Sequence, residues 1–92
     1  MENKFNKALR LLDQGQTERA IHILEEIIIE ARKEMDNLYL IRANCVLGEF
    51  FFSIGRIAEA KSCLTEVINT PYENDVIDYE KAIARDILNR LA

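Results

Sequence analysis

Apolar residues recur every three or four positions along most of the chain, which is the spacing of one face of an α-helix. Alternation at every second position, which would indicate a β-strand, is weak, and the chain contains only three glycines and one proline. The pattern therefore predicts an all-α protein of about five helices. The expected helices cover residues 2–14, 17–35, 38–54, 57–69 and 74–91.

The breaks between these helices carry residues that commonly end or begin one. Gly15 and Gly55 suit the left-handed conformation that often follows a helix C-terminus. Thr17 is a candidate N-cap for the second helix, and Asp36 or Asn37 for the third. These residues predict antiparallel neighbours joined by short turns.

An internal repeat relates the two halves of the chain. Two windows forty residues apart each contain a helix, a turn with glycine, and a helix with a small residue near its start. The paired positions are Leu11 and Phe51, Gly15 and Gly55, Ala20 and Ala60, Leu24 and Leu64, and Ile28 and Ile68. Neither hairpin can bury its apolar face alone, so the two are expected to stack as a short solenoid.

This pattern resembles the tetratricopeptide repeat family. The second window is the better match, through Leu47-Gly48, Phe51, Gly55, Ala60 and Leu64, which are similar to the Leu-Gly-x-x-Tyr signature and the small residues after it. In the first window the corresponding places are held by Ala8, Leu11, Gly15, Ala20 and Leu24. The resemblance implies a single domain over residues 1–92, with repeats at about 4–37 and 38–71 and a capping helix at about 74–91.

The sequence departs from the family pattern in three respects. Lys4 and Asn44 stand where the family has a tryptophan-like aromatic residue. The forty-residue spacing exceeds the usual period of about 34 residues, which suggests a longer second helix in the first unit. The family's late proline has only Pro71 as a counterpart, one residue early.

Charge and composition exclude several classes of function. Sixteen acidic and twelve basic residues give a formal charge of −4, and Arg32-Lys33 is the longest basic run, so we expect no nucleic-acid binding. The polar N-terminus lacks the apolar stretch of a signal peptide, and no apolar segment is long enough for a membrane span. We expect a cytoplasmic protein that does not bind membranes. Its initiating Met1 and its cap helix suggest a complete chain.

Residues that could support catalysis are scattered. The lone His22 is interpreted as a surface residue beside a carboxylate, and Cys45 and Cys63 as small apolar core residues. Further histidines, paired cysteines and glycine-rich phosphate loops are absent from the sequence. We therefore expect no enzyme activity, no metal and no cofactor.

Three consecutive phenylalanines, residues 50–52, indicate a binding surface. They sweep about 200° around a helix, so they cannot all enter one core. Phe51 is expected inside its hairpin, Phe50 against a neighbouring helix and Phe52 toward the inner groove. By the resemblance, the first helix of each unit lines that groove, and the predicted partner-binding residues are Phe5, Leu9, Leu12, Arg42, Glu49 and Phe52. The alternative is that the fifth helix or the N-terminus fills the groove.

Two further features concern the second helix. Ile29 lies alone on its charged face and is a weaker indication of contact. The carboxylates of that face, Glu25, Glu26, Glu30 and Glu34, are either an ordinary solvated edge or a contact surface for a basic partner.

The sequence favours a non-enzymatic protein–protein interaction module that binds another protein or a peptide. Its sharpest version is a small acidic inhibitor of the immunity type bound to a basic partner. Two alternatives stay open, namely a self-associating homodimer and an adaptor or chaperone subunit of a larger complex.

Overall fold

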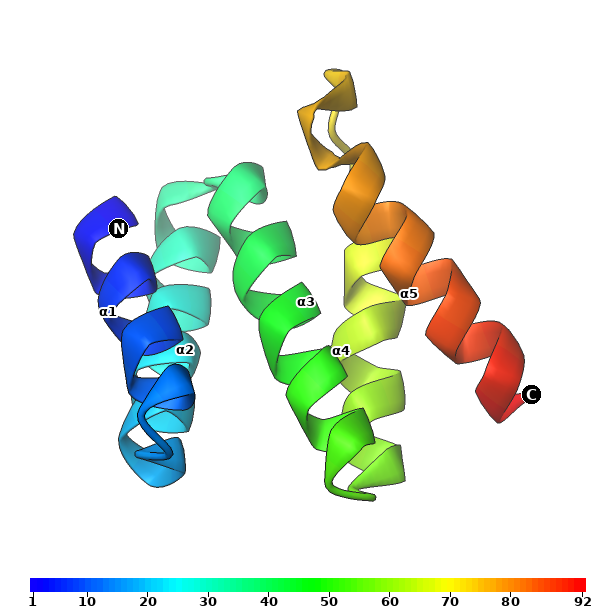
Figure 1. Cartoon of the computed structure of the whole chain (residues 1–92). Coiled ribbons are helices and arrows are strands. Elements are labelled where there is room, and N and C mark those ends of the chain that lie inside the picture. Colours follow the sequence, from blue (N-terminus) through cyan, green and yellow to red (C-terminus); the bar gives the residue numbers. More distant parts are fainter.

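The computed structural model describes residues 1–92 and consists of five α-helices and one short 3-10 helix (Figure 1). They are α1 (Glu2–Asp13), α2 (Thr17–Glu34), α3 (Asn37–Ser53), α4 (Ile57–Asn69), η1 (Asp75–Ile77) and α5 (Asp78–Leu91). The all-α prediction and the number of helices are confirmed. The predicted bounds of α4 are correct, and the predicted start of the fifth helix is the separate 3-10 turn η1. None of the helices combines the length and apolar character that a membrane crossing requires.

The helices form two layers, with α1, α3 and α5 in one and α2 and α4 in the other (Figure 1). Each helix packs on the next one along the chain, and α5 also packs on α3. Extents of 30 × 29 × 19 Å agree with two helix layers. The helices α1 and α5 lie at opposite ends of their layer, so α3 is the central element (Figure 1).

The two hairpins turn in the same way. Gly15 and Gly55 have φ angles of 76° and 81°, in the left-handed region that glycine enters without steric cost. In each turn, the amide one residue after the glycine donates to the carbonyl four residues before the glycine, at 2.8 Å. The predicted role of both glycines is confirmed.

Only one of the predicted caps forms. The Asp36 side chain accepts a hydrogen bond from the Tyr39 amide at 3.1 Å, so Asp36 caps α3 as expected. The prediction for Thr17 was wrong, because Gln16 holds the N-cap position of α2 and makes no side-chain capping bond. Met35 ends α2 in a left-handed conformation with φ 56°.

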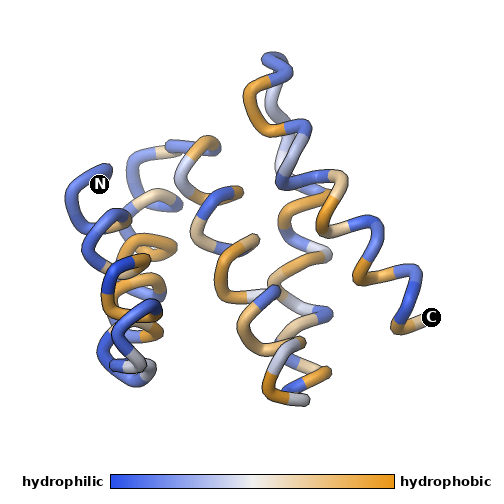
Figure 2. Tube along the Cα trace, in the orientation of Figure 1, coloured by the Kyte–Doolittle hydropathy of each residue, from blue (hydrophilic) through white to orange (hydrophobic).

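The core consists of two clusters that meet along α3. The first joins α1, α2 and α3 with Ala60 of α4, and the second joins α3, α4, η1 and α5. The repeat pairs Ala20 with Ala60 and Leu24 with Leu64 are fully buried. Figure 2 shows apolar positions concentrated in the middle of the molecule, where α3 lies. Ile57, at the start of α4, is exposed.

Gly48 marks the closest approach of α3 to α4. A Cβ built on Gly48 would lie 2.5 Å from Cδ2 of Leu64 and 3.4 Å from Cβ of Cys63. Leu64 is fully buried, so it has no space into which to withdraw.

We therefore predict that Gly48→Ala lowers the free energy of unfolding by about 1 to 2 kcal/mol, because overpacking outweighs alanine's better helix propensity. Urea unfolding followed by circular dichroism measures the change. Lys61→Ala, at an exposed position of α4, serves as the control and should stay within about 0.5 kcal/mol of the parent. A Gly48→Ala protein as stable as the parent would contradict the close helix approach.

Candidate functional site

The six residues predicted from the sequence lie on α1 and α3. Five are half-buried and Glu49 is exposed. Phe5, Leu12 and Phe52 pack against the first core cluster, and Phe52 also reaches the second. The Phe5 ring meets Tyr39 edge-on, with centroids 5.8 Å apart. None of the six lines a hollow of the surface.

The α3 end of this predicted surface is partly covered by α5. Arg42 Nε lies 3.8 Å from Oε2 of Glu80, and its guanidinium carbon lies 5.7 Å from the Tyr39 ring centroid. The Cys45 sulfur lies 3.9 Å from the backbone carbonyl oxygen of Glu80. Arg42 therefore already has partners within the chain. This agrees with the alternative in which the fifth helix fills the inner groove predicted from the sequence.

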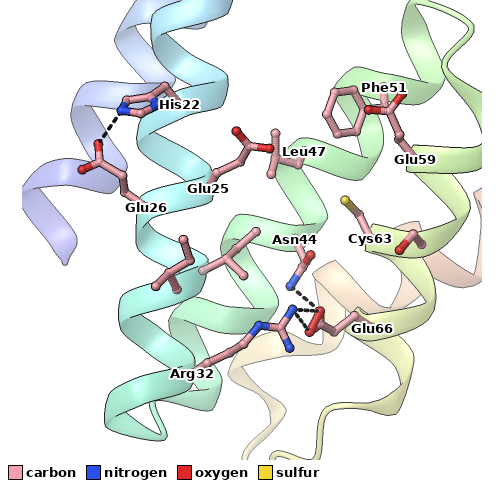
Figure 3. A pocket seen from close by; sticks show the side chains of 13 residues that line it. His22, Glu25, Glu26, Arg32, Asn44, Leu47, Phe51, Glu59, Cys63 and Glu66 are labelled. Carbon is pink, nitrogen blue, oxygen red and sulfur yellow. Dashed lines mark hydrogen bonds and ion pairs between the residues drawn. The ribbon is translucent and has the colours of Figure 1, made fainter.

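A separate hollow of about 570 Å³ opens between α2 and α4, where both helices pack on α3 (Figure 3). We call it the α2–α4 groove. Its floor is Asn44, Leu47 and Phe51 of α3, and its two walls are side chains of α2 and α4.

The middle of the α2–α4 groove is apolar. Leu47 and Phe51 are almost fully buried beneath it, with Ile28 and Cys63 half-buried on the two walls. Ile29 stands at the α2 edge with 69% of its surface exposed. The isolated apolar residue noted in the sequence therefore borders an apolar floor, which gives it a larger potential contact than an isolated surface isoleucine would have.

The rim of the groove is acidic. Glu25 and Glu26 come from α2, and Glu59 and Glu66 from α4. His22 pairs with Glu26 at 3.4 Å, which confirms the prediction of an exposed histidine beside a carboxylate. Glu25 makes no ion pair. The groove thus combines an apolar floor with excess negative charge at its edge.

One end of the groove is closed by a polar network. Arg32 Nη2 donates to Oε2 of Glu66 at 2.6 Å, and Asn44 Nδ2 donates to the same oxygen at 3.2 Å and to the Leu40 carbonyl at 3.0 Å. The network joins α2, α3 and α4 (Figure 3). Asn44 is 3% exposed, so these bonds satisfy an amide that would be costly to bury alone.

Sequence reasoning did not assign Asn44 or Glu66 to a site. Two features of the sequence could have indicated Asn44. It is a polar residue within the most apolar helix, and it stands where the tetratricopeptide repeat pattern has an aromatic residue. Lys4 holds that position in the first unit and pairs with Glu30 of α2 at 3.6 Å. In both hairpins, a polar residue at this position reaches a glutamate on the second helix.

No protein-family model, no curated protein and no solved structure matches this chain. Within the structure, no three histidine, cysteine, aspartate or glutamate side chains come together in a way that could hold a metal ion. The side chains that line the groove offer apolar contact, carboxylate charge and hydrogen bonding.

Both thiols are shielded from ionisation. Burial, with a smaller effect from Glu66 and other nearby carboxylates, raises the pKa of Cys63 from 9.0 to about 11. Burial likewise raises the pKa of Cys45 to about 12. Neither cysteine forms a disulfide.

We predict that the folded protein reacts slowly with iodoacetamide. At pH 8 the thiolate fraction of Cys63 is about a hundredfold below that of an ordinary thiol, because the thiolate forms only as the pH rises toward its raised pKa. Its alkylation rate should therefore keep rising above pH 9. Peptide mapping by mass spectrometry follows each cysteine, with urea-unfolded protein as the reference and the more buried Cys45 as the slower internal control. Equal rates in folded and unfolded protein would contradict the packing of Cys63 in the groove wall.

Proposed function

We propose that this protein is a non-enzymatic interaction module of the tetratricopeptide-like type, whose α2–α4 groove binds a basic, partly apolar segment of another protein. The observation that carries the proposal is the exposed Ile29 beside an apolar floor, bordered by an acidic rim that includes the unpaired Glu25. Complementary charge would speed encounter with a basic segment, and apolar contact would hold it.

The tetratricopeptide-like character is supported by the equivalence of the two units. Their glycine turns have matching φ angles and hydrogen bonds, and the small residues Ala20 and Ala60 are both fully buried. Gly48 allows the close approach of α3 to Leu64, the kind of contact that requires a residue without a side chain.

The charge of the groove argues against filling it with a second copy of the chain. In a symmetric dimer the same patch meets itself, so the acidic rims of the two copies would face each other. Like charges brought together in this way cost free energy rather than adding affinity. A basic partner is favoured instead, and a dedicated inhibitor of a basic protein is the sharpest version of that function.

Selection from a random peptide library provides the test. Peptides that bind the protein should be enriched in arginine, lysine and large apolar residues. The double variant Ile29→Gln with Glu25→Gln should bind them about tenfold more weakly, because it removes one apolar contact and one charge attraction.

Val76→Gln is the matched control, since Val76 is an exposed β-branched residue near α5 and outside the groove. Its affinity for the selected peptides should equal that of the parent. Selected peptides that lack basic residues, or that bind the double variant as well as the parent, would refute binding in this groove.

A further inference from the structure

A guanidinium group lies beside one corner of the α2–α4 groove. That corner is at the opposite end from the Arg32–Glu66 pair, where Phe51 and Glu59 meet (Figure 3). The Cζ atom of Arg56 lies 4.6 Å from the centroid of the Phe51 ring, which is cation–π distance. The same guanidinium forks onto Glu59, with Nε donating to Oε1 at 2.7 Å and Nη2 contacting Oε2.

The hairpin turn does not require this arrangement. Forty residues earlier the equivalent positions are Leu11, Gln16 and Arg19, which supply neither an aromatic ring nor a carboxylate. There Arg19 donates to the Gln16 side chain, and yet the glycine turn has the same geometry as in the second unit. The stacked and forked guanidinium is therefore particular to the second unit.

The charge that acts on Arg56 is not limited to Glu59. The hydrogen bond with Glu59 is the largest cause that raises the pKa of Arg56, and Glu18 and Glu25 of α2 add to it through their charge. Carboxylates from both walls thus act on the same cation. Arg56 is itself about half exposed, so it can swing into solvent while the helices stay in place.

We propose that this corner, formed by Phe51 and Glu59, is a receptor for an arginine side chain of the partner, and that Arg56 occupies it in the free protein. The inference deepens the proposed function, on which it rests, by naming the residue that the groove recognises. Arginine is favoured over lysine because only a planar guanidinium can stack on the ring and fork onto the carboxylate together. An incoming arginine displaces Arg56, which then turns to solvent.

Titration of the ¹⁵N-labelled protein with N-acetyl-arginine methylamide, followed by NMR, tests the receptor. Amide shifts should centre on Phe51 and Glu59 in the parent protein. Arg56→Gln should bind the probe about two- to fivefold more tightly, because it removes the internal competitor. Glutamine is the residue that the first unit carries at this position, so the turn should still form. Glu59→Gln should weaken binding, and N-acetyl-lysine methylamide should bind less tightly than the arginine probe.

Arg90→Gln is the matched control, because it removes the same charge from an exposed i,i+4 pair with Asp86 on α5. It should leave the affinity for the probe unchanged. Equal gains from Arg56→Gln and Arg90→Gln, no shifts at the corner, or equal binding of the two probes would each overturn the receptor. If the receptor is overturned but the selected peptides still need Ile29 for binding, the proposed function stands. Failure of the proposed function would instead show in the peptide selection.

Discussion

Burial of α3 on almost all sides is the constraint on which the rest of the structure depends. Its residues enter both core clusters, and it contacts α2, α4 and α5. A helix that is apolar around most of its circumference has to be enclosed by neighbours. The two hairpins and the last helix supply that enclosure, and the hollow between α2 and α4 lies over the buried α3 residues Asn44, Leu47 and Phe51. The groove is therefore a consequence of how α3 is buried.

Close approach between α3 and α4 sets the position of one groove wall. Gly48 lets Leu64 lie against the α3 backbone, which brings Cys63 and Glu66 beside the floor. The opposite wall is held by the pair between Arg32 and Glu66, with Asn44 bonded to the same carboxylate. Apolar packing thus fixes one side, and a polar network ties the two walls together at one end.

Periodicity made the helices predictable, because each local rule agreed with the fold. The spacing of apolar residues, the two glycines and Asp36 all act within a few residues, so the sequence displays them directly. The prediction for Thr17 was wrong because a threonine can begin a helix without capping it. The groove could not be derived in this way, since its walls depend on where α2 and α4 stand relative to each other.

The family resemblance predicts a binding surface on the first helices of the two units, at Phe52 and its neighbours. Those residues remain a prediction, on a surface where α5 already engages Arg42. For the α2–α4 groove, the sequence contained one local indication, the apolar Ile29 on a charged helix face. The sequence alone could not interpret it, because the groove floor beside Ile29 is formed by residues about twenty positions further along the chain.

Comparison of the two units shows where the chain departs from what the fold alone requires. Buried small and apolar residues are shared between them, because both hairpins solve the same packing problem. At the turn the two units differ, because Leu11, Gln16 and Arg19 of the first correspond to Phe51, Arg56 and Glu59 of the second. Since the first set forms the turn equally well, stability of the turn does not explain the ring, the carboxylate and the guanidinium of the second. Phe51 and Glu59 line the groove and Arg56 stacks on the ring, so the proposed recognition of an arginine would account for all three residues.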